Sequence, residues 1–175
     1  MAAELRLVTE VEPTVAPPVD FEGFFSEESE RLFRRLWLVT RDRAEAEDIV
    51  QEAFIVVLER WDRVRAMEEP AGYLYRVAFN AWRKRSRRAS RAVQRTVSAY
   101  HEQADPFDGA DARTVIGAAL ETLTARQRAA LVLTDLVGMT SEEAASVLRI
   151  RAVTVRVLSS QARAAMRHRI GGADG

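Results

Sequence analysis

The stretch GYLYRVAFNAWRKRSRRASRAVQR, residues 72–95, decides the fold expected of the whole chain. Its first half is aromatic and apolar, and its second half holds seven basic residues and no acidic one. The apolar side chains recur at the three- and four-residue spacing of a helix with one buried face: Leu74, Val77, Ala78, Ala81 and Trp82. Pro70 suits the first turn of that helix, where its missing N–H costs nothing. The stretch therefore predicts one long helix that packs its first half into a core and presents its second half to an anionic partner.

Aromatic rings beside arginines in this helix are typical of binding to single-stranded nucleic acid, because bases stack on rings while guanidinium groups hold phosphates. A solvated helix end is the simpler interpretation of a charge run. Like charges close together destabilise an isolated helix, however, so we expect a partner here.

The composition excludes several kinds of function. The 175 residues suffice for one or two small domains. The chain has no Cys, which rules out disulfides and thiolate metal sites, and its two His residues are far apart, so we expect no metal and no cofactor. No apolar run approaches the roughly 20 residues of a membrane span, and no secretory signal opens the chain. A cytoplasmic protein without membrane association is expected.

The formal net charge is zero, but the charges are unevenly distributed. Residues 1–75 carry 9 Arg against 17 acidic residues, whereas residues 76–101 carry 8 basic residues and no acidic one. Residues 102–175 carry 9 of each sign. An acidic block before a basic block predicts two partner surfaces, one for a basic protein and one for nucleic acid.

Periodicity predicts an all-α chain of two small domains, at 21–98 and 113–170, joined by a flexible linker at 99–112. Disordered tails are expected at 1–20, which is rich in Pro, and at 171–175. A helix over 21–40 is followed by Asp42, a good N-cap for the next helix. The exposed edge of that second helix is expected to carry three carboxylates: Glu45, Asp48 and Glu52.

The second domain is expected to contain a helix-turn-helix at 141–160. Capping boxes at 124–127 and 140–143 each open a helix, and Gly138 suits the end of the first of these helices. A tight turn at 149–151 leads into a last helix, about 152–169, which holds several Arg and no acidic residue. In such a motif the second helix enters the major groove of DNA and its first residues meet base edges.

Three segments resemble the bacterial RNA polymerase sigma-70 family, and within it the extracytoplasmic-function (ECF) sigma factors. They are AEDIVQEAF at 46–54 followed by WD at 61–62, YLYRVAFN at 73–80 with the arginines after it, and LETLTARQRAAL at 120–131 with the helices that follow. The resemblance implies a sigma factor, not an enzyme, that joins core RNA polymerase and directs promoter recognition and melting. Sigma domain 2 would span 21–98 and sigma domain 4 would span 113–170.

The resemblance also implies which residues meet which partner. The β′ clamp helices of polymerase would meet Glu47, Asp48, Gln51 and Glu52, and the β flap would be a second polymerase contact. The loop at 62–72 would capture a flipped base of the −10 promoter element, which would be held by Tyr73, Tyr75, Asn80, Arg83, Lys84, Arg87 and Arg88. The −35 element would be read by Arg151, Thr154, Arg156, Val157, Ser160 and Arg163. An anti-sigma factor is a further implied partner.

Three positions depart from the family pattern. Arg149 stands where the turn usually has Gly, and a positive φ there would cost an L-residue about 1–2 kcal/mol. Ser159 replaces an expected Leu of the last helix, with Leu158 beside it to fill the space. Lys84 replaces an Asp. These changes lead us to expect loose reading of the −35 element.

Three other functions fit parts of the chain. A helix-turn-helix regulator that does not join polymerase would explain 113–170 but leaves AEDIVQEAF without a role. An enzyme with a carboxylate cation site at Glu45, Asp48 and Glu52 would lack any phosphate loop or nucleophile motif. A protein-binding decoy that has lost DNA contact is compatible with the altered last helix.

Overall fold

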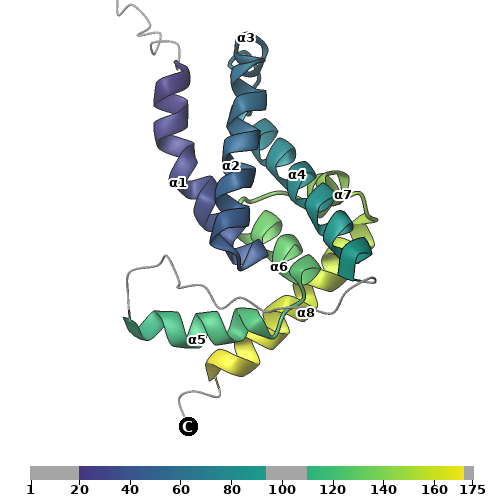
Figure 1. Cartoon of the computed structure of the whole chain (residues 1–175). Coiled ribbons are helices and arrows are strands. Elements are labelled where there is room, and N and C mark those ends of the chain that lie inside the picture. Colours follow the sequence, from purple (N-terminus) through teal and green to yellow (C-terminus); the bar gives the residue numbers. More distant parts are fainter. Residues whose placement is uncertain (1–19, 94–109, 172–175) are drawn as a thin grey trace, which may run out of the picture.

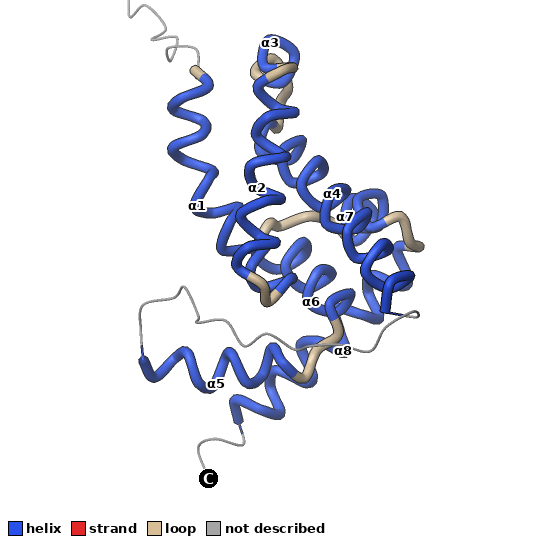
Figure 2. The backbone as a smooth tube through the Cα atoms, viewed as in Figure 1, coloured by secondary structure: helices blue, strands red, loops and turns tan. Residues whose placement is uncertain are grey.

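The computed structural model describes residues 20–93 and 110–171, which form helices joined by short loops, with no β-strand among them. Figure 1 shows their arrangement, and Figure 2 shows the same path coloured by secondary structure. The predicted all-α class is confirmed. The tails and most of the linker expected from the sequence lie outside the described residues. None of the described helices is long and apolar enough to cross a membrane.

The N-terminal unit contains α1 (Phe21–Thr40), α2 (Arg43–Leu58), α3 (Trp61–Val64) and α4 (Pro70–Val93). Aspartates begin α1 and α2, because the carboxylates of Asp20 and Asp42 accept hydrogen bonds from the N–H groups of Gly23 (2.7 Å) and Glu45 (3.0 Å). α2 packs against both α1 and α4. Its acid-rich outer face therefore stays exposed while its apolar stripe enters the core.

The C-terminal unit contains α5 (Ala110–Glu121), α6 (Ala125–Leu131), the π-helical turn η1 (Val132–Leu136), α7 (Ser141–Leu148) and α8 (Ala152–Gly171). Both predicted capping boxes are formed, Thr124 with Gln127 and Thr140 with Glu143. Gly138 follows η1 with a φ of 81°, a conformation that glycine adopts without strain. The π-helical turn itself was not predicted from the sequence.

The turn between α7 and α8 is built on Arg149, whose φ of 53° and ψ of 50° place it in the left-handed region. The positive φ considered for this position is thus present. Ser159 remains in the core with 2% of its surface exposed. Its Oγ lies 3.3 Å from Oγ1 of Thr134, so the buried hydroxyl has a polar neighbour. Leu158 packs beside it at the edge of the core.

The two units pack against each other, a feature that local periodicity did not predict. One continuous apolar core takes Leu36 and Phe79 from the N-terminal unit and Leu133 and Val147 from the C-terminal unit. α1 packs on α6 and η1, and α4 packs on α7, as Figure 1 shows. The two helical units therefore form a single body in this structure.

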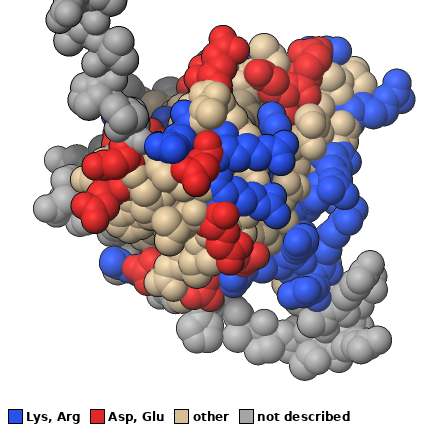
Figure 3. Space-filling view, turned by 90° about the horizontal axis from the view of Figure 1, so that it is seen from above, with Lys and Arg blue, Asp and Glu red and all other residues tan. Residues whose placement is uncertain are grey.

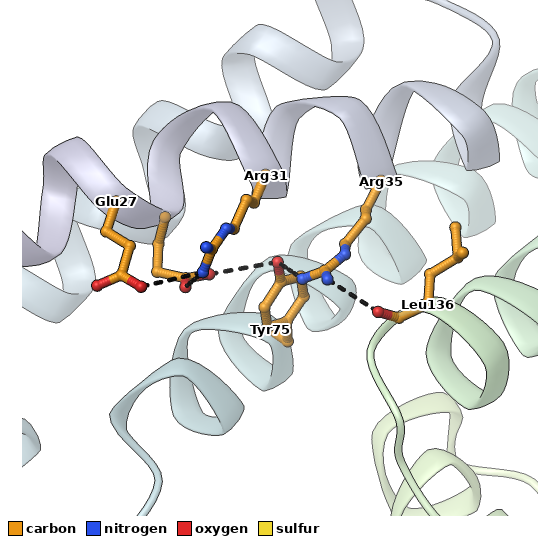
Figure 4. A network of polar contacts seen from close by, with 6 residues as sticks. Glu27, Arg31, Arg35, Tyr75 and Leu136 are labelled. Carbon is orange, nitrogen blue, oxygen red and sulfur yellow. Dashed lines mark hydrogen bonds and ion pairs between the residues drawn. The ribbon is translucent and has the colours of Figure 1, made fainter.

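Hydrogen bonds from arginines to main-chain carbonyls also cross the boundary. Nε of Arg128 donates to the carbonyl of Val39 over 3.0 Å, and Nη2 of Arg35 donates to the carbonyl of Leu136 over 2.8 Å. Figure 4 shows Arg35 reaching from α1 toward both Leu136 and the hydroxyl of Tyr75. Bonds to a charged donor contribute about 1.5–3 kcal/mol each, so these bonds help to hold the units together.

Two large apolar side chains, one on α1 and one on α5, are exposed. Phe25 has 44% of its surface exposed and Ile116 has 45%. Ile116 lines a mostly apolar groove of about 380 Å3 together with Leu136 and Ile170. The apolar face of α5 packs on α8 and buries Leu120, but Ile116 on the same helix remains uncovered.

Candidate nucleic-acid and protein interfaces

The outer face of α2 carries Glu47, Asp48, Gln51 and Glu52, all exposed. Arg85 of α4 joins two of them, with guanidinium nitrogens 3.3 Å from Oδ2 of Asp48 and 3.1 Å from Oε2 of Glu52. The hydrogen bond with Glu52 raises the pKa of Arg85. The Asp48 and Glu52 side chains are still 63% and 48% exposed. The carboxylates are thus oriented by Arg85 but remain open to a cationic partner.

The same face continues into two exposed apolar residues that sequence reasoning missed. Ile55 is 58% exposed and Leu58 is 54% exposed. They follow Gln51 by four and seven residues, which places all three on one side of the helix. That spacing was a usable signal, because it adds large apolar side chains to an acidic helix edge. Such a mixed surface is typical of a protein-binding site, where an apolar centre is surrounded by polar residues.

Glu45 differs from its expected place on the exposed acidic edge. It is half-buried, and its pKa is raised mainly by burial and then by the charge of Asp42. Within the described parts of the chain no three carboxylates or histidines lie close enough to hold a metal ion. The cation site weighed for Glu45, Asp48 and Glu52 therefore has no geometric support.

The start of α4 lies next to a hollow of about 450 Å3 that is lined by residues 58–63 at the end of α2 and the start of α3. Arg60 in this hollow donates a hydrogen bond to the hydroxyl of Tyr73 over 3.0 Å. Tyr73 is half-buried, so part of its surface remains accessible. An aromatic ring, a guanidinium group and a hollow are thus brought together where the sequence led us to expect capture of a base.

The rest of α4 carries the basic residues expected to bind DNA. Lys84, Arg87 and Arg88 are exposed, whereas Arg83 is half-buried and donates to Oδ1 of Asn80 over 3.0 Å. Figure 3 shows basic side chains gathered along one side of the face in view, with acidic side chains spread over the rest. The arrangement provides one cation held by Asn80 and three exposed cations for phosphate groups.

Tyr75 is a correction to the expected DNA-binding set. It is 1% exposed, its hydroxyl lies 3.4 Å from Oε2 of Glu28, and the Arg35 guanidinium lies 5.0 Å from its ring centre. Burial is the main cause that raises the pKa of Tyr75 to about 12. The helical period of α4 puts Tyr75 beside Leu74 and Ala78 on the core side, so its ring cannot meet DNA in this packing.

All the residues of the helix-turn-helix that were expected to read DNA are exposed: Arg151, Thr154, Arg156, Val157, Ser160 and Arg163. Two of them make ion pairs within the unit. Nη1 of Arg156 lies 3.0 Å from Oε1 of Glu142 in α7. Arg163 forms a bidentate ion pair with Asp135, in which Nε and Nη2 each donate a 2.8 Å hydrogen bond to one carboxylate oxygen. The hydrogen bond from Arg163 lowers the pKa of Asp135. Arg163 is therefore engaged with η1, whereas Thr154 and Val157 in the first two turns of α8 are exposed.

A helical unit with an acidic and apolar docking face and a basic, aromatic helix, followed by a helix-turn-helix, defines a DNA-binding transcription factor. Comparison with known families narrows this class. Residues 24–92 match Sigma-70 region 2, and residues 113–166 match Sigma-70, region 4. The chain belongs to the sigma-70 family and has the two-region organisation of its ECF sigma factors.

Individual relatives are similar over most of their length. The ECF RNA polymerase sigma factor SigM of Mycobacterium tuberculosis is 26% identical over 151 residues, which cover 86% of this chain and 77% of the relative. The RNA polymerase sigma-E factor of Streptomyces avermitilis is 26% identical over 160 residues, covering 89% and 88%. The sigma factor RpoE from Bartonella quintana, solved in complex with the anti-sigma factor NepR, has the same fold, with a TM-score of 0.69, 20% identity and coverage of 87% and 97%.

Proposed function

We propose that this chain is an ECF-type sigma factor that binds core RNA polymerase through α2 and holds promoter DNA with α4 and α8. The observation that carries the proposal is the presence of regions 2 and 4 in one chain, with the exposed face of α2 fully formed. A helix-turn-helix regulator that acts without polymerase would have no need of that face.

The α2 face fits a basic, partly apolar surface, which we expect to be the β′ clamp helices. Asp48, Gln51 and Glu52 supply charge and hydrogen bonding, and Ile55 and Leu58 supply apolar area that a partner would cover. Charge complementarity speeds association and selects the partner, while burial of the apolar side chains contributes about 25 cal/mol for each Å2 removed from water. The apolar groove around Ile116 is the surface that we assign to the β flap.

Two surfaces are assigned to promoter DNA. Tyr73, Asn80 and the basic residues of α4 would hold the single-stranded −10 element, since stacking and phosphate contacts together favour an unpaired strand. Arg151, Thr154, Arg156, Val157 and Ser160 would read the −35 element from the major groove. The energy for opening the duplex comes from these contacts, and no bond is made or broken by the protein.

The packed arrangement must open for both elements to be read. They lie 25 base pairs apart by their names, which corresponds to about 85 Å of duplex at about 3.4 Å per pair. In this structure α4 contacts α7, the first helix of the helix-turn-helix. The form described here is therefore a closed form, and binding to polymerase would separate the two units. A protein that binds the closed form, such as an anti-sigma factor, would keep the chain from promoters.

Reconstitution tests the proposal. The purified chain, added to core RNA polymerase that lacks a sigma factor, should co-purify with it and support transcription from discrete start sites on genomic DNA fragments. Mapped transcripts would then show shared sequence near −10 and −35. Binding to DNA without binding to core polymerase would instead favour the regulator. Binding to polymerase without specific transcription would favour the decoy.

A further inference from the structure

A cleft lies where the two units meet, between the C-terminal half of α4, the start of α6 and the turn from α7 to α8. Its volume is about 640 Å3, within the range of about 300–1,000 Å3 that is typical of small-molecule sites. Arg83 and Arg87 line it from the N-terminal unit, and Arg126 and Arg149 line it from the C-terminal unit. None of the described residues that line the cleft is acidic.

Among the residues that the structure describes, no carboxylate inside the cleft balances the charge of these arginines. Arg83 donates to Oδ1 of Asn80 and, over 3.4 Å, to the carbonyl of Val147. Its Nε is buried and has no hydrogen-bond partner among the residues that the structure describes. Burial lowers the pKa of Arg83, and the charges of Arg149 and Arg87 lower it further. A negatively charged ligand would relieve this repulsion and supply the missing acceptor.

The remaining lining indicates what else such a ligand can contain. Ser86 and Thr124 place hydroxyl-bearing side chains at the cleft, and Trp82, Leu148, Ile150 and Leu158 form an apolar floor. Guanidinium groups bind phosphate with two parallel hydrogen bonds, which makes several arginines well suited to a ligand with several phosphates. The volume limits that ligand to a small molecule.

We propose that this cleft binds a small polyphosphate, with the four arginines on phosphate oxygens and the apolar floor under the rest of the ligand. Because its walls come from both units, the bound ligand stabilises the closed form. Arg83 and Arg87 are also assigned to promoter DNA, so the ligand and DNA exclude one another. This last consequence rests on the proposed function, whereas binding in the cleft does not.

The test uses the full chain and inorganic tripolyphosphate, with sodium chloride added to match ionic strength. At a ligand concentration about 100 times its Kd, linkage predicts a rise in Tm of about 5–10 °C. The double variant Arg126→Gln and Arg149→Gln should bind at least about tenfold more weakly, because it removes two charge-assisted contacts. Both side chains are exposed, and Arg126→Gln alone serves as a second, milder variant.

The matched control is the double variant Lys84→Gln and Arg88→Gln. It removes the same charge from exposed positions of α4 that do not line the cleft, so it should bind tripolyphosphate as the wild type does. Equal weakening in both double variants would mean diffuse binding to a basic surface and would overturn the proposal. An unchanged Tm of the wild type would overturn it as well.

A competition experiment separates this proposal from the assignment of DNA contacts. Tripolyphosphate should displace a fluorescent single-stranded −10 oligonucleotide from the wild type, and at least about tenfold more should be needed with the double variant Arg126→Gln and Arg149→Gln. If the ligand raises the Tm but leaves the oligonucleotide bound, the cleft site stands and the DNA role of Arg83 and Arg87 is wrong.

Discussion

Arg35 of α1 and Leu136 at the end of η1 are 101 residues apart in sequence and are joined by a hydrogen bond of 2.8 Å from the guanidinium to the main-chain carbonyl. The same guanidinium reaches the hydroxyl of Tyr75 on α4. One side chain thus connects the helix expected to hold −10 DNA with the unit expected to read the −35 element.

Removing such connections should open the closed form. We expect the double variant Arg35→Met and Arg128→Met to lose about 3 kcal/mol or more of stability of the packed state, since each bond from a charged donor contributes about 1.5–3 kcal/mol. Small-angle X-ray scattering should show a larger radius of gyration. Arg31→Met is the control, because Arg31 forms ion pairs with Glu27 and Glu28, which lie on its own helix. An unchanged radius in the double variant would show that apolar packing alone holds the units together.

Charge reversal should identify the α2 face as the polymerase contact. Asp48→Lys with Glu52→Lys should reduce affinity for core polymerase at least about tenfold, mainly through a slower association rate. The two changes also break the pairs with Arg85. Adding Arg85→Glu restores an internal pair of opposite polarity and separates the two effects. If the triple variant regains polymerase binding, the loss came from α2 packing and the assigned interface is wrong.

The exposed apolar part of this face should contribute independently. Ile55→Ser should weaken polymerase binding, because fully burying such a side chain contributes about 1.5–3 kcal/mol. Since Ile55 is 58% exposed in the free chain, the Tm of the Ile55→Ser variant should differ little from that of the wild type. Titration of labelled core polymerase gives the affinity, and a thermal melt gives the stability. Equal affinity of variant and wild type would place the interface elsewhere.

The α7–α8 turn should prefer glycine to alanine at position 149. The φ of 53° costs an L-residue about 1–2 kcal/mol, so Arg149→Gly should be more stable than Arg149→Ala by about 1 kcal/mol after the greater chain entropy of glycine is included. Because both variants lose the guanidinium group, their comparison isolates the effect of the backbone conformation at position 149 on stability. Tm should differ by about 2–4 °C. A lower Tm for the glycine variant would show that the turn is not strained.

The buried hydroxyl of Tyr75 should make stability fall at high pH. Its pKa is raised from 10.0 to about 12, so between these values the unfolded chain loses the proton while the folded chain keeps it. The contribution of the protonated Tyr75 hydroxyl to the free energy of unfolding is complete below pH 10. Above pH 10 it decreases by up to about 1.4 kcal/mol per pH unit. Tyr75→Phe should lack this decrease. Urea unfolding should therefore be measured from pH 7 to 11.5. The unfolding free energy of the wild type minus that of Tyr75→Phe should be constant up to about pH 9.5 and should decrease above it.

Much of the local structure followed from the sequence alone. The boundaries of α1, the N-cap at Asp42 and both capping boxes were predicted, because each depends on residues within one or two turns of one another. At Arg149 the family resemblance identified a turn that usually has glycine, and the structure shows the positive φ there. The 3.6-residue period placed three carboxylates on the outer edge of α2; Asp48 and Glu52 are exposed there, whereas Glu45 is half-buried.

The tertiary structure decided what depends on residues far apart in the chain. It buried Tyr75 beneath Arg35, paired Arg85 with the acidic face of α2 and left Ile116 uncovered. It also brought Arg83 and Arg87 to Arg126 and Arg149, which creates a cleft that neither unit contains by itself. Helical periodicity specifies which face of a helix is apolar but not which neighbour covers it. The partner of each face is selected by packing of the whole chain, because burial of apolar area depends on all the helices together.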